Sequence, residues 1–339
     1  MWRVVDIAGD GRHLSLQRQH LVVSLGGDEL GRVPLADIQS VIVHGHGATF
    51  TVDLAVALAR EGVPLVLADS AHRPVALSLP VDGHFEHALR LRAQADASPA
   101  RRDRIWRDIV MAKITAQAEA LDITGQRGGR ALAKFSRAVE PGDPGNVEGR
   151  AARAYWQRLF GPAFRRDRER GDVNGALNYG YTVLRAACAR AIVASGLSAA
   201  LGVHHRGRLN AMQLADDLME PYRPLVDIVV WQNREAWADG LPSEGKAALV
   251  AITNRPINGP DGVTPLHRAL GATALSLANL FLGSRKDLWL PPTLALPAEP
   301  PGDDHESETA DPPQAVRRRR AVAHRGDLRV PGDVADRDV

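Results

Sequence analysis

The hydrophobic pattern changes near residues 80–83, and this change restricts the fold more than any other feature of the chain. Before it, short runs rich in Val, Leu and Ile are separated by glycine-containing turns such as GDG and GGDELG. This spacing is typical of antiparallel strands. Residues 1–80 are therefore predicted to form a small β-rich domain. Strands are expected at RVVDIA, HLSLQ, HLVVSL, SVIVHG and PLVLAD, and one helix at TVDLAVALAREG.

Beyond the change, apolar residues recur at three- and four-residue steps, for example at Ile105, Ile109 and Ala116. Such a stripe is typical of an amphipathic helix. The fold class is thus predicted to be α+β, with a larger all-α catalytic domain over residues 81–290. Within it, further helices are expected at residues 147–160, 175–194, 209–221 and 267–283.

The end of the chain has a different composition. From about residue 291 it is poor in apolar residues, and an acidic block precedes a basic block that begins with RRRR. This composition predicts a disordered tail over residues 291–339.

Composition also restricts the class of protein. The single cysteine, Cys188, excludes an intramolecular disulfide, and no apolar run approaches the length of a membrane span. Together with the lack of a signal-like N-terminus, this leads us to expect a cytoplasmic protein with no membrane partner. The net charge of +2 is too small to indicate nucleic-acid binding by itself. The basic excess within residues 101–170 is nevertheless larger than that of the whole chain.

Glu148 stands out because it lies in line with the apolar face of the helix predicted over residues 147–160. Ala151, Tyr155 and Leu159 share that face. Burial of an unpaired charge is unfavourable, so such a carboxylate is normally in an ion pair, a helix cap or a metal site. Glu148 also lies in the first turn, where the helix dipole favours an acid. The spacing leaves capping and metal binding both open.

The segment LGVHHRGRLNAMQLADDLMEP combines histidines with a group of acids. A short loop presents His204 and His205, and the helix predicted after it carries Asp216, Asp217 and Glu220 within about one turn, so that the acids can converge. Like charges this close repel unless a cation neutralises them. One imidazole with carboxylate oxygens suits Mg²⁺ or Mn²⁺ better than it suits a thiolate-rich zinc site.

Ordinary structural roles stay open for these residues. Arg223 could form a simple salt bridge with Glu220, and histidines without a ligand role are common in cores and on surfaces. Several other functions lack support, because the sequence has no GxxxxGK[ST], no GxGxxG after a strand, no CxxC pair and no GxSxG. These absences argue against nucleotide hydrolysis, dinucleotide binding, zinc fingers and serine hydrolysis.

Taken together, these segments resemble the CRISPR-associated integrase of the adaptation module, the nuclease that captures spacers in CRISPR systems. The resemblance covers about residues 1–290. It is carried by an E-G-x-A-A-x-x-Y helix, a G-x-x-H loop and a D-L-M-E-P-x-R helix in that order, within DPGNVEGRAARAYW and GLSAALGVHHRGRLNAMQLADDLMEPYRPLVD. The HH doublet and the short β-domain look most like the type II version, which is found beside a single large RNA-guided effector nuclease.

The resemblance implies an N-terminal domain that mediates homodimerisation and a helical domain that holds one metal ion. By motif match, the metal ligands and catalytic residues are Glu148, His205 and Glu220. Asp217 is implied as a supporting residue, and His204 takes the ligand role if the loop is shifted by one position. The implied cofactor is Mg²⁺ or Mn²⁺.

The implied reaction is metal-dependent transesterification, in which the 3′ ends of a captured DNA duplex attack opposite strands at the ends of a CRISPR repeat. With water as the nucleophile, the same site is a DNA endonuclease. The implied partners are double-stranded DNA and a small dimeric adaptation protein, with the effector nuclease as a further candidate. A catalytically silent DNA-binding scaffold and a metal-dependent phosphoesterase for small substrates are the alternative functions. Candidate phosphate contacts are Arg101, Arg102, Arg165 and Arg166.

Overall fold

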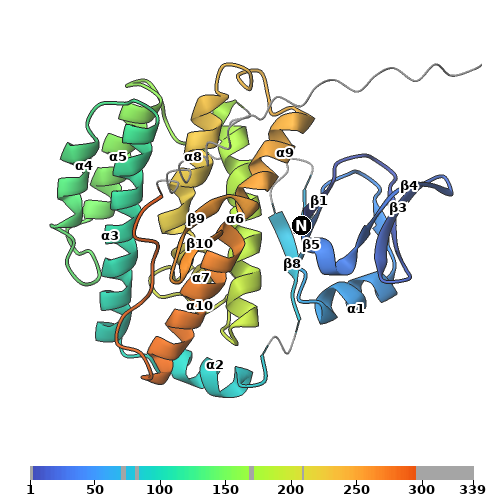
Figure 1. The fold of residues 1–339 in the computed structure, drawn as a ribbon, viewed down its shortest axis with the longest axis horizontal. Helices are drawn as coiled ribbons and strands as arrows, with labels where there is room; N and C mark the ends of the chain where they lie inside the picture. The colour runs from blue at the N-terminus through green and yellow to red at the C-terminus, as the bar shows by residue number, and fades with distance from the viewer. Residues whose placement is uncertain (1–2, 70–73, 81–83, 168–171, 208–209, 295–339) are drawn as a thin grey trace, which may run out of the picture. The chain divides into compact units, whose positions relative to one another are not determined.

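The computed structural model describes residues 3–69, 74–80, 84–167, 172–207 and 210–294 (Figure 1). The described residues belong to one compact unit.

The first sheet of the N-terminal domain is mixed rather than antiparallel. Its strand order is β1 (Arg3–Ile7), β5 (Ile38–Val43), β7 (Leu65–Ala68) and β8 (Pro74–Ser78). β1 pairs with β5 and β5 with β7 in parallel, and only β7 and β8 run antiparallel. The expectation of an antiparallel domain is therefore wrong for this sheet. The physical reason is helix α1 (Val52–Arg60), which carries the chain back so that β5 and β7 run in the same direction.

The second sheet has the order β4 (Asp28–Pro34), β3 (His20–Leu25), β2 (His13–Gln17) and β6 (Thr49–Phe50). Here β2, β3 and β4 form the expected antiparallel ladder. The predicted turn GGDELG is shorter than expected. The chain reverses at Gly26 and Gly27, which have positive φ, and the residues from Asp28 onward belong to β4. Leucine and valine side chains from both sheets and from α1 form a separate hydrophobic core.

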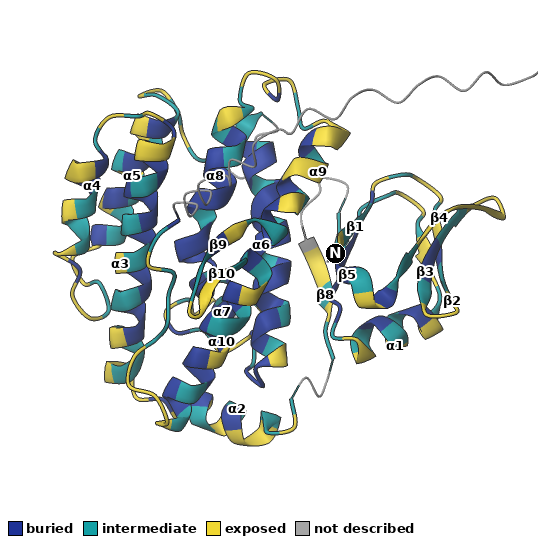
Figure 2. Ribbon diagram, in the orientation of Figure 1, coloured by how far each residue is buried: buried dark blue, intermediate teal, exposed yellow. Residues whose placement is uncertain are grey.

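The second domain is predominantly helical, as predicted, and its core includes most of the buried apolar residues (Figure 2). None of the helices in the described ranges is long and apolar enough to cross a membrane. The helices are α2 (His87–Ala95), α3 (Pro99–Ile123), α4 (Gly129–Ser136), α5 (Val147–Leu159), α6 (Val173–Ala194), α7 (Gln213–Leu218), α8 (Arg223–Gln232), α9 (Ser243–Ala251) and α10 (Leu266–Leu282).

Two helices organise this domain. α3 packs against α4, α5 and α8, and α6 packs against α7, α8, α9 and α10 (Figure 1). The helices predicted over residues 147–160, 175–194 and 267–283 are confirmed in α5, α6 and α10.

Three predicted features of the helical domain need correction. A single helix over residues 209–221 is wrong: Leu209 lies outside the described residues, α7 begins only at Gln213, and a 3₁₀ turn follows it. The turn Glu220–Tyr222 contains Pro221, and proline cannot donate the backbone hydrogen bond that would continue α7. The domain is also not all-α, because a hairpin of β9 (Pro256–Gly259) and β10 (Gly262–Pro265) precedes α10.

The third correction concerns the predicted tail. Leu294 is only 1% exposed, and its backbone N–H donates to Glu119 on α3, so residues 291–294 belong to the folded part of the chain. The remainder of the predicted tail, residues 295–339, lies outside the described residues.

Arg190 on α6 connects the helical domain to the first sheet. Its guanidinium donates to the carbonyl oxygens of Ile38 and Gln39, each at 2.8 Å, and to that of Glu61 at 3.1 Å. Burial of the guanidinium lowers the pKa of Arg190 to about 10, which leaves it charged at neutral pH.

We expect Arg190→Met to lower the free energy of unfolding by about 1–3 kcal/mol, because two partly buried carbonyl groups and an exposed one lose a charged donor. Urea denaturation followed by circular dichroism measures this change. The matched control is Arg130→Met on the exposed surface of α4, with an expected effect within about 0.5 kcal/mol. Equal effects of the two substitutions would contradict the role assigned to Arg190.

Candidate metal centre

The start of α5 frees Glu148 from a capping role. The carboxylate of Asp143 accepts hydrogen bonds from the backbone N–H groups of Val147 and Glu148, both at 2.9 Å, and the side chain of Asn146 accepts from Gly149. These contacts satisfy the donors that a helix start leaves open. A Cβ atom at Gly149 would lie 2.5 Å from Asn146 Oδ1, so glycine follows Glu148 because the cap leaves no room for a side chain.

With the cap supplied by other residues, the Glu148 carboxylate turns to Lys113 on α3. Lys113 Nζ contacts Glu148 Oε1 and lies 2.5 Å from Glu220 Oε2. The other oxygen of Glu220 lies 3.0 Å from Arg223 Nε. Two of the three predicted ligands, far apart in the sequence, therefore meet at one buried ammonium group. Sequence reasoning missed Lys113, although a lysine between Ile109 and Ala116 in an apolar stripe is a visible signal.

The charges around Glu220 explain its ionisation. Burial alone would raise the pKa of this carboxyl, but the guanidinium of Arg223 and the ammonium of Lys113 outweigh it and lower the pKa of Glu220 to about 2. The same two carboxylates outweigh burial at Lys113, whose pKa is raised. Glu220, Lys113 and Arg223 are therefore charged at neutral pH. The salt bridge between Arg223 and Glu220, which the sequence left open, is present.

Asp217 binds the backbone of the loop that carries His204 and His205. Its side chain is fully buried and accepts hydrogen bonds from the backbone N–H groups of Val203 at 2.6 Å, His204 at 3.1 Å and His205 at 3.3 Å. It also lies 2.6 Å from Nδ1 of the His205 ring. This contact raises the pKa of His205 above its usual value. With Nδ1 donating to Asp217, Nε2 is left for a ligand, which is how carboxylates orient metal-binding histidines.

Steric crowding explains why Gly202 occupies the first position of the G-x-x-H loop. A Cβ atom at Gly202 would lie 2.5 Å from the carbonyl oxygen of His205 and 3.0 Å from Asp217 Oδ2. Any larger residue would push the loop away from Asp217. The loop motif is therefore explained by close packing of its backbone on the buried carboxylate.

Trp106 of α3 separates the roles of the two histidines. Its ring stacks on His204 with centroids 4.2 Å apart and planes 5° apart, whereas it meets His205 edge-on at 5.9 Å. Burial lowers the pKa of His204. His204 thus packs flat on an aromatic ring, and His205 is the histidine whose ring is oriented by a carboxylate.

The acids of α7 do not converge on one point, and that expectation is wrong. Asp216 instead accepts two hydrogen bonds, of 2.7 and 2.8 Å, from the guanidinium of Arg185 on α6. Asp217 faces the histidine loop, and Glu220 lies beyond the end of α7 beside Lys113. Three acids that helical spacing makes neighbours are separated by three different cationic or donor partners.

Sequence reasoning also missed a group of buried side chains that support Arg223, namely Asp227, Tyr155 and Tyr181. Asp227 of α8 is buried and accepts hydrogen bonds from the hydroxyl groups of Tyr155, at 2.9 Å, and Tyr181. The Arg223 guanidinium lies over the Tyr181 ring, 4.6 Å from its centroid. Burial raises the pKa of Asp227 to about 6, although both hydroxyl groups oppose that rise. This group of side chains supports Arg223 and, through it, Glu220.

The four arginines proposed for DNA contacts already have intramolecular partners. Arg101 donates to the carbonyl oxygen of Phe281, and Arg102 to that of Ala95. Arg165 donates to the carbonyl oxygens of Pro162 and Phe164. Arg166 donates to the side chains of Asn174 and Asn178 on α6. Their role in DNA binding stays a prediction.

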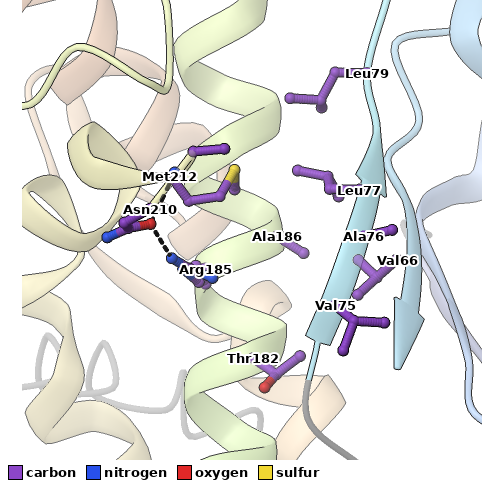
Figure 3. A pocket seen from close by; sticks show the side chains of 11 residues that line it. Val66, Val75, Ala76, Leu77, Leu79, Thr182, Arg185, Ala186, Asn210 and Met212 are labelled. Carbon is purple, nitrogen blue, oxygen red and sulfur yellow. Dashed lines mark hydrogen bonds between the residues drawn. The ribbon is translucent and has the colours of Figure 1, made fainter. Parts of the chain in front are cut away.

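A pocket of about 460 Å³ lies apart from this centre, between β7, β8, α6 and the segment before α7 (Figure 3). Leu77, Leu79 and Met212 contribute apolar walls, and Arg185 donates to Asn210 at its edge. None of the predicted metal ligands lines it. We therefore place the candidate centre at Lys113 rather than at this cavity.

The donor set fits a hard divalent cation. The carboxylates of Glu148 and Glu220 already contact one positive charge, the ammonium of Lys113. Asp217 binds Nδ1 of His205, so Nε2 of that ring is left for a ligand. Glu220 is close enough to contribute to the raised pKa of His205. Within the described ranges, no three His, Cys, Asp or Glu side chains lie close enough to share an ion as they stand. The ammonium of Lys113 lies between two of the predicted ligands, Glu148 and Glu220.

The sequence resemblance implies a strand-rich domain followed by a helical domain, and the structure has this arrangement. A comparison with family models identifies the family: the one described as CRISPR associated protein Cas1 matches residues 5–239. The chain belongs to the Cas1 family. A curated relative from Neisseria meningitidis, named CRISPR-associated endonuclease Cas1, is 40% identical over 230 residues, which cover 68% of this chain and 75% of the relative.

Solved structures share the fold. A casposase bound to its integration product matches with a TM-score of 0.71 at 20% identity, covering 84% of this chain and 92% of that chain. A Cas6-RT-Cas1–Cas2 complex matches with a TM-score of 0.67 at 21% identity, covering 84% of this chain and 36% of that chain. At these identities the likeness concerns the fold alone.

We expect Asp227→Asn to change how stability depends on pH. The pKa of Asp227 is about 6 in the folded chain, above its ordinary value of 3.8, so the folded state holds this proton more tightly. Its contribution to stability is complete below pH 3.8 and is lost as the pH rises through about 6. Relative to Asp227→Asn, the parent should lose up to about 3 kcal/mol of unfolding free energy between about pH 4 and pH 7.

Urea denaturation at several pH values measures this difference. Asp239→Asn, at an exposed aspartate, is the matched control and should run parallel to the parent across the range. A parallel curve for Asp227→Asn as well would show that the buried carboxyl does not titrate in this window.

Proposed function

We propose that this chain is a divalent-metal-dependent DNA integrase and endonuclease that inserts captured DNA fragments into a CRISPR array. The observation that carries the proposal is the meeting of Glu148 and Glu220 at one buried positive charge, next to a His205 ring oriented by Asp217, in a member of the Cas1 family. Because the array is part of the cell's own DNA, the proposal places the chain in the cytoplasm.

Glu148, Glu220 and His205 Nε2 are the groups that would hold Mg²⁺ or Mn²⁺. When bound, such an ion stabilises the negative charge that builds up on the scissile phosphate and its oxygens. Asp217 keeps the histidine ring in the tautomer that has a free Nε2. Arg223 keeps Glu220 ionised and is itself supported by the Tyr181 ring. Because no side chain needs to become covalently attached to DNA, the 3′ hydroxyl of a fragment or a water molecule is the proposed nucleophile.

The proposed partners are double-stranded DNA, a second copy of this chain and a small dimeric adaptation protein, with an RNA-guided effector nuclease as a further candidate. Two names among the similar structures support the first and third of these: one is a casposase bound to integration product, and another is a complex of Cas1 with Cas2.

We expect Glu148→Ala, His205→Ala and Glu220→Ala each to lower strand transfer at least about a hundredfold, because each removes a ligand that stabilises the transition state. The assay joins a labelled duplex with 3′ hydroxyl ends to a supercoiled plasmid that carries a CRISPR repeat, with and without the adaptation partner. Product should form with Mg²⁺ or Mn²⁺ and not with EDTA.

Two controls sharpen this test. Glu140→Ala, at an exposed glutamate before α5, should retain parental activity. His204→Ala should retain more activity than His205→Ala, because His204 stacks on Trp106 while His205 is oriented by Asp217. Duplex binding without metal-dependent joining would identify a silent scaffold, and metal-dependent cleavage of small phosphoesters with weak DNA binding would identify a phosphoesterase. Either result would overturn the proposal.

A further inference from the structure

Lys113 is unusual for its surroundings. It lies on the buried face of α3, is only 8% exposed, and has Ile109, Val110 and Ile114 as fully buried neighbours in the same helix. Lysine is almost never this buried unless it is paired. Its ammonium contacts Glu148 and lies 2.5 Å from Glu220, so it meets both carboxylates of the candidate metal centre at once.

The ammonium and a divalent cation require the same space. A hard cation held by Glu148 and Glu220 would lie between their oxygens, where Lys113 Nζ now lies. Two cations in contact with the same pair of oxygens would repel each other strongly in a buried site. Lys113 must therefore give up at least one carboxylate when the ion binds.

The balance of charge shows the direction of the effect. Glu148 and Glu220 carry two negative charges, and Lys113 and Arg223 carry two positive charges in contact with them. The four side chains are neutral as a group, so a divalent cation gains little net attraction. Without the ammonium the group would be negative, and it would attract a cation more strongly.

We propose that Lys113 is a built-in counter-ion that holds Glu148 and Glu220 together in the absence of metal and sets the cation affinity of the centre by competing for them. This inference rests on the proposed function, since it takes these two carboxylates as metal ligands. The ammonium keeps the carboxylates from repelling each other before the ion arrives. It also requires an ion to displace it, which makes occupancy of the centre depend on the divalent cation concentration.

The test is Mn²⁺ binding to the full chain, measured from the paramagnetic resonance signal of free Mn²⁺, with no DNA and no reaction. Lys113→Met and Lys113→Gln both remove the charge, and each should tighten Mn²⁺ binding by about tenfold or more. Lys113→Arg keeps the charge and should bind no more tightly than the parent. Thermal melting in EDTA should show a lower midpoint for the Met and Gln variants, and Mn²⁺ should raise their midpoints by more than it raises that of the parent.

Glu148→Gln separates the two proposals. If the parent binds Mn²⁺ and Glu148→Gln does not, the metal centre is supported. Unchanged or weaker binding by both neutral Lys113 variants would then overturn the competition proposal alone. If Glu148→Gln binds Mn²⁺ as the parent does, the assigned centre fails and the role of Lys113 fails with it. Tighter binding by Lys113→Arg as well as by the neutral variants would show that side-chain shape, rather than charge, sets the affinity.

Discussion

Compensation of buried charge around Lys113 is the interaction on which the rest of the helical domain depends. Lys113, Glu220 and Asp227 are all buried in the helical domain, and each is held by oppositely charged or hydrogen-bonding groups from another element. Loss of one partner would leave an uncompensated charge, which is far more destabilising than loss of the pair. The arrangement of α3, α5 and α8 is therefore tied to these contacts as much as to apolar packing.

The same contacts separate the residues that orient the centre from those that can perform chemistry. Asp143 and Asn146 hold the start of α5, so that Glu148 is free to face inward. Asp217 holds the histidine loop and one ring nitrogen of His205. Asp143 and Asn146 accept hydrogen bonds from backbone N–H groups, and Asp217 is buried. The side chains of Glu148 and His205, in contrast, are partly exposed to solvent. A site built in this way is preorganised before any ligand binds.

Much of the fold could be predicted because local patterns specify it. The apolar spacing of α3, α5, α6 and α10 is regular over several turns, and each of these helices is present. Prediction failed where a distant contact or a proline decides. β5 and β7 of the first sheet are parallel because of the crossover through α1, and the helix predicted up to Pro221 ends early in a 3₁₀ turn. Residues after 290 looked like tail, yet Leu294 is buried because Glu119 on α3 accepts its backbone N–H.

For the candidate site, the sequence by itself determined that Glu148 shares the apolar face of its helix, that a glycine precedes the histidine pair, and that three acids follow within about one turn. Only the tertiary structure decided the partner of each acid: Asp216 goes to Arg185, Asp217 to the histidine loop, and Glu220 to Lys113. The physical reason is that helical spacing restricts only which residues of one helix are neighbours. The charge that a carboxylate meets is supplied by α3 and α6, whose residues come close only when the chain is folded.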